Sequence, residues 1–329
     1  MASARVVAQA KVNLFLRILA REASGFHQLE TLFCRLALGD EVHVRLTAGS
    51  RSLDCAGIAM PPGGLGPVER NLAWRAALAF LEATRWGTGF AIEVDKRIPV
   101  GGGLGGGSAD AGGVLRALNA LAPEPLSAHE LLRLAVRLGA DVPFLTQDRT
   151  PLALAWGRGD RLLFLPPLPA RPCLLFVFGA GVATADAYRW LAESPGSPPA
   201  AVGHEPERFA RWSDVELMAY NEFERVVLPR RPDIRQVVEG LRTAEVRSVL
   251  PTALMSGSGA TVFALARDAR ETPGNAGYAL QLRLDAEAGP PRPGWPSVEG
   301  VVEGGPRLPV TGVLESWTAD RVEPVTLAD

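Results

Sequence analysis

The stretch "DKRIPVGGGLGGGSADAGG", Asp95–Gly113, decides how this chain must fold around it. Six of the seven residues 101–107 are glycine, and Ser108 follows. Glycine loses more backbone freedom on folding than any other residue. A run of glycines this dense therefore indicates a specific role for the backbone. The preceding "FAIEVDKRI" alternates apolar and polar residues, which predicts a half-buried strand. After the run, apolar residues recur at the spacing of one helix face until Pro123: Ala111, Val114, Leu115, Leu118 and Ala122.

A strand, a glycine-rich turn and a helix together predict an anion-binding site. The first N–H groups of a helix lack backbone partners and point outward, and the helix dipole adds partial positive charge there. Glycines let the backbone approach a phosphate without a Cβ in the way. The stretch therefore predicts a phosphate-binding loop. A flexible linker is the weaker alternative, because a well-patterned strand and helix bracket the loop closely.

Three known kinds of phosphate loop fit this stretch poorly. The run satisfies G-x-G-x-x-G, but so many glycines match that pattern almost by chance. A dinucleotide-binding loop would also need an acidic residue about 20 positions further on, at the end of a strand. The candidate, Glu124, lies instead between two prolines. A Walker A loop needs a lysine before the serine, and Gly107 stands there. A protein-kinase loop joins two strands, and here a helix is expected.

Composition indicates an ordinary globular chain. It has 329 residues, 47% hydrophobic and 21% charged, with a net charge of -2, which favours two domains. Nothing in this balance predicts a nucleic-acid-binding face, and no apolar run approaches the roughly 20 residues that span a bilayer. The three cysteines are far apart, which predicts reduced thiols and no metal site. We expect a cytoplasmic protein whose partners are neither nucleic acid nor membrane.

Lysine is almost absent from this chain. Of 34 basic residues, only Lys11 and Lys96 are lysines. A GC-rich genome favours arginine wherever the two cations are interchangeable, so the remaining lysines mark places that need a compact ammonium. Chance survival is the alternative. Lys11 lies in the first strand candidate, 6–19, predicted as one strand or as two broken near Asn13. Lys96 directly precedes the glycine loop.

The rest of the chain divides near the proline cluster at 164–172. We expect an N-terminal domain over 1–166 and a C-terminal domain over 167–329, with an irregular Gly/Pro-rich stretch at about 267–309. Asn71 is expected to start a helix that runs through Ala83. Ser127 and Glu130 form a capping box that predicts a helix ending at Gly139, and Asp141 follows at once. In the second half, helix 184–193 is expected, and the small-residue turn "MSGSGA" is expected to pack close to the phosphate loop.

Several motifs together resemble a known superfamily. "PVGGGLGGGSADA" resembles the ATP loop of the GHMP kinases. "AKVNLFLRILAREASGFHQLETLFCRLALGDEV", "LGADVPFL" and "MSGSGATVFA" resemble, in the same order, motifs of one family within it, the 4-diphosphocytidyl-2-C-methyl-D-erythritol kinases. The loop alone indicates only the superfamily. The stretch after Arg267 departs from the family, which usually ends in a shorter helix and a final strand.

The resemblance implies an α+β fold of two domains with the active site between them. The N-terminal domain would be ribosomal-protein S5-like and the C-terminal domain ferredoxin-like. The implied reaction transfers the γ-phosphoryl group of ATP, with Mg²⁺, to the 2-hydroxyl of a cytidyl-linked methylerythritol. This step belongs to the non-mevalonate route to isoprenoid precursors.

The resemblance also assigns the catalytic and ATP-binding residues. Asp141 matches the general base and Lys11 the lysine that polarises the same hydroxyl. On local sequence alone, Asp141 would be a turn aspartate and Lys11 a lysine at a strand end. The expected ATP-binding residues are Lys96, Pro99, Val100, Gly101, Gly102, Gly103, Leu104, Gly105, Gly106, Gly107 and Ser108. Ser108 is also expected to help hold Mg²⁺, or to act as an ordinary N-cap. Asp110 either attends the metal or favours the helix N-terminus.

The acceptor site is expected around the motif "GFHQLET". Phe26, where the family often has tyrosine, would stack on the cytosine, and Tyr188 would lie on its other side. His27 would hydrogen-bond the edge of the base, Asn13 would contact the polyol, and Thr184 would line the same pocket. Without the resemblance, His27 would be a solvated loop residue and Tyr188 a helix core residue.

Other functions stay open on the sequence alone. Another small-molecule GHMP kinase, such as homoserine or mevalonate kinase, would not need the aromatic platform of "GFHQLET" or Asn13. A nicotinamide-dependent oxidoreductase would need the missing strand-end acid. A binding protein without catalysis is disfavoured by the presence of both Lys11 and Asp141. The sequence leaves open whether the protein is a monomer or a homodimer.

Overall fold

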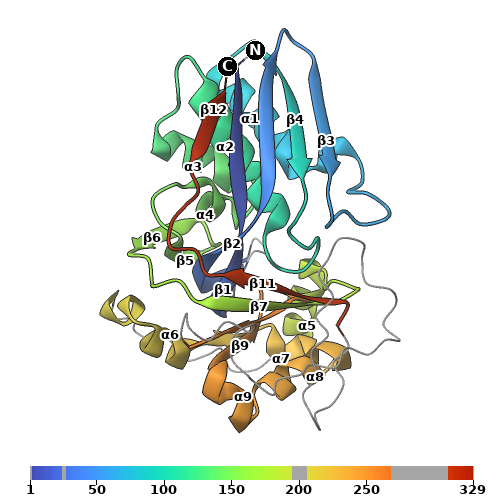
Figure 1. Cartoon of the computed structure of the whole chain (residues 1–329), viewed down its shortest axis with the longest axis vertical. Coiled ribbons are helices and arrows are strands. Elements are labelled where there is room, and N and C mark those ends of the chain that lie inside the picture. Colours follow the sequence, from blue (N-terminus) through green and yellow to red (C-terminus); the bar gives the residue numbers. More distant parts are fainter. Residues whose placement is uncertain (1, 24–26, 195–205, 268–309, 329) are drawn as a thin grey trace.

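The computed structural model describes residues 2–23, 27–194, 206–267 and 310–328. Two sheets and the helices packed on them make up this part of the chain (Figure 1). The first half contributes β1 (Ser3–Arg21), β2 (His27–Thr47), β3 (Arg51–Ala56), a 3-10 turn (Val68–Arg70), α1 (Leu72–Thr84), β4 (Gly89–Asp95), α2 (Gly106–Leu121), α3 (Ala128–Leu138), α4 (Val142–Thr146), β5 (Leu152–Gly157) and β6 (Arg161–Leu165).

The second half follows with shorter elements. They are β7 (Pro172–Val177), α5 (Thr184–Glu193), a 3-10 turn (Pro206–Ala210), α6 (Trp212–Met218), β8 (Tyr220–Asn221), α7 (Glu224–Val227), α8 (Pro232–Leu241), α9 (Ala244–Val249), β9 (Thr252–Met255), β10 (Val262–Leu265), β11 (Gly312–Trp317) and β12 (Val325–Ala328). None of the helices in the described part of the chain is long and apolar enough to cross a bilayer.

The larger sheet holds the first half together. Among the described residues it has eight strands, with the path β12-β1-β2-β4-β3, β5 between β2 and β6, and β8 beside β1. In β4, Phe90, Ile92 and Val94 are buried, so the half-buried strand before the glycine loop is confirmed. Because β12 pairs with β1, both ends of the chain lie together at the top of Figure 1.

Strand β1 is continuous, but its pairing with β2 is irregular near the predicted site. The register shifts between Gln9 and Lys11 and again between Asn13 and Phe15. Such bulges bend a strand and redirect its side chains. Lys11 and Asn13 lie between the two irregularities and two residues apart, so they share one face of the sheet. Strand β2 begins at His27 and pairs with β1 from there, so His27–Thr31 of the motif "GFHQLET" belong to a strand.

Helix α2 begins two residues earlier than the sequence predicted. Its N-cap is Gly105, whose φ of +73° turns the chain directly into the helix. Few residues besides glycine adopt that conformation. Ser108 is therefore the third helical residue and not the N-cap. The other predicted helix starts are confirmed, since Asn71 caps α1 and the capping box of Ser127 and Glu130 opens α3.

The smaller sheet lies between two hydrophobic cores. In the described ranges its four strands run β11-β7-β10-β9, all antiparallel. In β7, Leu175 packs into the core of the larger sheet, and Leu174 and Phe176 pack toward the helices of the second half. Strands buried on both faces explain the nearly unbroken apolar run of β7. The division at residue 166 stays a prediction, as does the irregular Gly/Pro-rich stretch, of which residues 268–309 lie outside the described residues.

Candidate active site

One cleft of about 540 Å³ brings most of the predicted residues together. Its size is typical of a small-molecule site. Residues that were predicted and that line it are Lys11, Asn13, Lys96, Pro99, Val100, Gly101, Gly102, Gly103, Leu104, Gly105, Gly106, Gly107, Ser108, Asp141, Thr184 and Tyr188. His27 is not among the lining residues, but its ring stacks on that of Tyr188, which is. Phe26 lies outside the described residues.

Two different constraints favour glycine in the loop. A Cβ at Gly103 would lie 2.1 Å from the carbonyl oxygen of Ser256, and its φ is +78°. At Gly101 the φ is +77° but a Cβ would meet no atom within 4 Å, so only the backbone conformation favours glycine there. The turn after β9 closes over the loop, because Ser256 Oγ donates to the carbonyl of Gly103 at 2.9 Å and Thr261 N–H to that of Gly102 at 3.1 Å. The predicted contact between this turn and the loop is confirmed.

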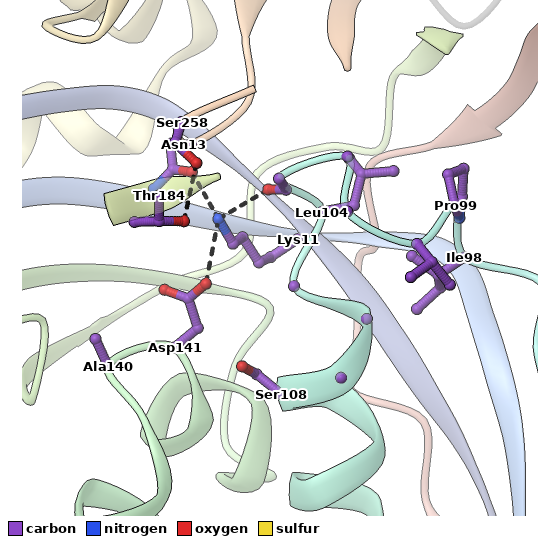
Figure 2. Close-up of a pocket in the computed structure, with 18 of the residues that line it drawn as sticks. Lys11, Asn13, Ile98, Pro99, Leu104, Ser108, Ala140, Asp141, Thr184 and Ser258 are labelled. Atoms are coloured by element: carbon purple, nitrogen blue, oxygen red, sulfur yellow. Dashed lines mark hydrogen bonds and ion pairs between the residues drawn. The ribbon is translucent and has the colours of Figure 1, made fainter. Parts of the chain in front are cut away.

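The start of α2 presents N–H groups to the cleft. The first intrahelical bond runs from Ala109 N–H to the carbonyl of Gly105, at 2.8 Å. The N–H groups of Gly106, Gly107 and Ser108 precede that bond and have no partner within their own helix. Figure 2 shows Ser108 and Asp141 reaching the same space from α2 and from the turn before α4. This end of the cleft is suited to an anion.

Lys11 connects the loop, the acceptor side and Asp141. Its ammonium donates to Asn13 Oδ1 at 2.8 Å and to the carbonyl of Gly103 at 3.1 Å, and lies 3.4 Å from Asp141 Oδ2 (Figure 2). Its backbone N–H donates to the carbonyl of Leu104 at 3.0 Å. The backbone of β1 is thus bonded directly to the loop. Because Lys11 is buried and both its backbone N–H and its ammonium are hydrogen-bonded within the protein, its side chain does not extend into solvent.

Asp141 stands between two helices and keeps its carboxylate available. It is the N-cap of α4, but its side chain makes no capping bond to that helix. The side chain is 32% exposed, against 4% for Lys11. A carboxylate that is paired on one side and open on the other can accept a proton from a bound hydroxyl.

Asn13 has a fixed orientation. Its Nδ2 donates to Thr31 Oγ1 at 2.8 Å, and Thr31 donates in turn to the carbonyl of Phe15 at 2.7 Å. The amide oxygen is thereby directed at Lys11. Thr31 is a residue of the site that sequence reasoning missed, although it lies within the quoted motif.

An aromatic cluster forms the far end of the cleft. The ring of Tyr188 stacks on that of His27, with centroids 4.2 Å apart, and meets Phe223 edge-on at 5.0 Å. Burial, and next the nearby carboxylate of Asp141, raise the pKa of Tyr188 to about 12. Its hydroxyl therefore stays protonated at neutral pH. Thr184 Oγ1 and Ser258 Oγ lie 3.0 Å apart in hydrogen-bond contact beside this cluster.

Lys96 belongs to a closed ion cluster beneath the loop. Its ammonium donates to Asp110 Oδ2 at 2.6 Å and to Asp40 Oδ2, and all three side chains are at most 4% exposed. The other oxygen of Asp40 accepts the N–H groups of Arg97 at 2.6 Å and Ile98 at 2.8 Å, which fixes the chain just before the loop.

This cluster changes the expectations for two residues. Lys96 adds no unpaired positive charge to the cleft, and a role in binding ATP stays a prediction. Asp110 pairs with Lys96 rather than only favouring the helix N-terminus. Burial, which outweighs the nearby Lys96, and the neighbouring carboxylate of Asp40 raise the pKa of Asp110 to about 8. Sequence reasoning missed Asp40, because 56 residues separate it from Lys96 and no local pattern links them.

Comparison with known proteins gives a consistent result. Residues 71–148 match the family model "GHMP kinases N terminal domain". A 4-diphosphocytidyl-2-C-methyl-D-erythritol kinase from Deinococcus radiodurans is 40% identical over 289 residues, covering 88% of this chain and 89% of the relative. The enzyme of that name from Pelobacter propionicus is 39% identical over 268 residues, covering 82% of this chain and 91% of the relative.

A solved structure agrees with these relatives. The crystal structure of a 4-(cytidine 5'-diphospho)-2C-methyl-D-erythritol kinase superposes with a TM-score of 0.65 at 32% identity, covering 96% of this chain and 99% of that one. The α+β, two-domain GHMP kinase fold expected from the sequence is thus confirmed. The chain belongs to the family of 4-diphosphocytidyl-2-C-methyl-D-erythritol kinases.

Proposed function

We propose that this protein transfers the γ-phosphoryl group of ATP to the 2-hydroxyl of 4-diphosphocytidyl-2-C-methyl-D-erythritol, with Asp141 and Lys11 as its catalytic residues. One observation carries the proposal. The ammonium of Lys11 contacts both the glycine-loop carbonyl of Gly103 and the carboxylate of Asp141. A phosphate held by the loop and a hydroxyl held at Asp141 would therefore meet at one cation.

Phosphoryl transfer requires mainly positioning and charge stabilisation. Asp141 would accept the proton of the acceptor hydroxyl, because its carboxylate is open on the side away from Lys11. Lys11 would hold that hydroxyl and the incoming phosphoryl oxygen close together, which converts the reaction into an effectively unimolecular step. Asn13, directed at Lys11, would contact the polyol beside the reacting hydroxyl.

The loop and the start of α2 would bind the β- and γ-phosphates through their free N–H groups. Within the described ranges, no group of three or more His, Cys, Asp or Glu side chains is arranged to hold a metal ion. That fits Mg²⁺, which in nucleotide sites takes few protein ligands and relies on the phosphates. The hydroxyl of Ser108 lines the cleft and would hold the ion with those phosphates. Bound Mg²⁺ would neutralise charge that develops on the transferred group.

The aromatic end of the cleft would bind the cytosine. Tyr188 lines the cleft, and the ring of His27 stacks on it. Base–aromatic stacking contributes about 1–3 kcal/mol per base. We propose Phe26 as the second ring and His27 as the residue that reads the edge of the base. A small acceptor such as homoserine or mevalonate would leave this end of the cleft unfilled.

We propose that the protein works in the cytoplasm as a monomer or homodimer. Its partners would be small molecules and not nucleic acid. A net charge of -2 supports the exclusion of nucleic acid, because such binding relies on clustered basic residues.

Release of ADP by the purified protein tests the proposed function. Four acceptors are compared at equal concentration: the cytidyl-methylerythritol substrate, homoserine, mevalonate and galactose. We expect turnover with the first alone, and a product phosphorylated at the 2-hydroxyl. Faster turnover with any of the other three would reject the acceptor assignment and leave only the kinase class.

A further inference from the structure

Arg35 occupies the position opposite Lys11 in the larger sheet. The two residues are register partners in the antiparallel pair β1–β2. Side chains of directly opposed residues lie on the same face of a sheet. Arg35 is 1% exposed, so its guanidinium is directed into the protein beside the catalytic lysine and not into solvent.

The guanidinium of Arg35 holds the C-terminal end of α4. Its Nη2 donates to the carbonyl of Phe144 at 2.7 Å and to that of Gln147 at 2.8 Å. It also lies over the ring of Phe144, with 5.2 Å from the guanidinium carbon to the ring centroid. The last carbonyls of a helix have no partners within it, and here Arg35 supplies partners for two carbonyls at the end of α4.

Helix α4 is the element that carries Asp141, and it is held at both ends from one place in the sheet. Lys11 contacts Asp141 at its N-terminal end, and Arg35 contacts its C-terminal end. A helix of five residues has little stability of its own, so its position depends on tertiary contacts. The phosphate-loop helix approaches as well, since a Cβ at Gly112 of α2 would lie 2.6 Å from the carbonyl oxygen of Leu145.

We propose that Arg35 is a positioning residue for the general base. By binding the end of α4, it sets where the carboxylate of Asp141 stands relative to Lys11 and the loop. This inference rests on the proposed function, because it takes Asp141 as the base of the reaction. Arg35 itself is not among the residues that line the cleft.

The contribution of Arg35 lies in its donors and not in filling space. Burial is the main cause that lowers the pKa of Arg35 to about 9, with the nearby Arg116 adding to it. Burying the charged guanidinium therefore costs free energy that only its hydrogen bonds offset. An apolar side chain of similar length would fill the same space without this desolvation cost. A displacement of Asp141 by 1 Å is enough to lower a rate by about 100-fold.

Two substitutions separate positioning from packing. Arg35→Met keeps the length and removes every donor, and Arg35→Lys keeps a cation with fewer donors. For Arg35→Met we expect kcat to fall by about 10- to 100-fold with the KM for ATP unchanged, and for Arg35→Lys a smaller fall. Phe80→Leu is the control, because Phe80 is fully buried in α1 and does not line the cleft. That variant should lose stability but keep its kcat.

A double-mutant cycle with Asp141→Asn tests whether Arg35 acts through the base. If it does, Arg35→Met should lower the residual rate of Asp141→Asn far less than it lowers the wild-type rate. An equal fall in both backgrounds would overturn the proposal, and so would an unchanged kcat in Arg35→Met. If Arg35→Met does not fold, Arg35→Lys enters the same cycle under the same criteria.

Failure of this proposal is distinguishable from failure of the proposed function. Wild-type turnover with the cytidyl-methylerythritol substrate is the first arm of the experiment and depends on no Arg35 variant. If the wild type turns over and the cycle is additive, the function stands and the role of Arg35 is wrong. If the wild type prefers another acceptor, the cycle is run with that acceptor and still tests Arg35.

Discussion

The two lysines of this chain both lie close to the glycine loop, in ion clusters of different kinds. Lys11 faces one carboxylate, that of Asp141, at 3.4 Å, and Asp141 is 32% exposed. Lys96 lies between Asp40 and Asp110, which are 0% and 4% exposed. We call the first cluster open, because its carboxylate is partly exposed, and the second closed, because both of its carboxylates are buried, although Lys96 and Asp110 also line the cleft.

Under the proposed function, in which Lys11 is catalytic, the difference means that proximity to the glycine loop is not enough to make a lysine catalytic. In the closed cluster both carboxylates are buried around Lys96, and Asp40 also accepts two N–H groups of the chain that enters the loop, although Asp110 Oδ1 has no hydrogen-bond partner. In the open cluster one side of the carboxylate is left for a ligand. A cation that serves the reaction should have a partner that a substrate can reach, and a cation that serves the fold should have partners that are buried with it.

Asp141→Asn gives the largest expected effect on the open cluster. The amide cannot accept the hydroxyl proton, and a general base contributes about 10²–10⁴-fold. Turnover should fall by that factor while the affinity for ATP stays unchanged, as measured by ADP release and by nucleotide titration. Near-normal turnover would place the base elsewhere and remove the distinction between the two clusters.

Lys96→Met probes the closed cluster. It leaves two buried carboxylates without their cation, and breaking a buried ion pair costs about 3–5 kcal/mol. The free energy of unfolding in urea should fall by that amount, while kcat of the folded fraction stays close to the wild-type value. Loss of turnover without loss of stability would instead assign Lys96 to the chemistry.

Tyr188→Ala tests whether the cleft beside the open cluster binds an acceptor that carries a cytidine nucleotide. Loss of one stacking ring, worth about 1–3 kcal/mol, should raise the KM for the cytidyl substrate by roughly 10-fold and leave the KM for ATP alone. Tyr188→Phe keeps the ring and is the matched control. Equal KM values for Tyr188→Ala and wild type would put the cytosine elsewhere in the cleft.

Asp110→Asn is expected to act on stability, with an effect that depends on pH. The pKa of Asp110 is raised from 3.8 to about 8 on folding, so between these values the folded state binds more protons than the unfolded state. Its contribution to stability is present at low pH and is lost as pH rises toward 8. The free energy of unfolding of Asp110→Asn should therefore depend less on pH between 5 and 8 than that of the wild type, as urea titrations can measure. Parallel profiles would show that Asp110 stays ionised throughout.

Local patterns predicted much of the fold. The capping box at Ser127, the cap at Asn71 and the helix 184–193 all appear where the sequence placed them, because each depends on residues a few positions apart. The start of α2 was wrong by two residues, since the left-handed turn at Gly105 replaces a side-chain cap.

Long-range partners could not be predicted in the same way. Asp40 is 56 residues from Lys96, and Arg35 is 109 residues from Phe144. Neither pair leaves a periodic signal, because the fold alone brings the residues together. The meeting of Lys11 and Asp141 was implied by the family resemblance, and periodicity or spacing did not predict it.

Lys11→Met, examined for both turnover and stability, tests the central claim most directly. The methionine fills the space of the lysine stem, and the Asp141 carboxylate left behind is partly exposed. We predict that kcat falls by about 100-fold or more, while the free energy of unfolding falls by only about 1–3 kcal/mol, because Asn13 Oδ1 and the carbonyl of Gly103 each lose a donor. Wild-type turnover in the folded fraction of Lys11→Met, or a loss of stability as large as that of Lys96→Met, would contradict it.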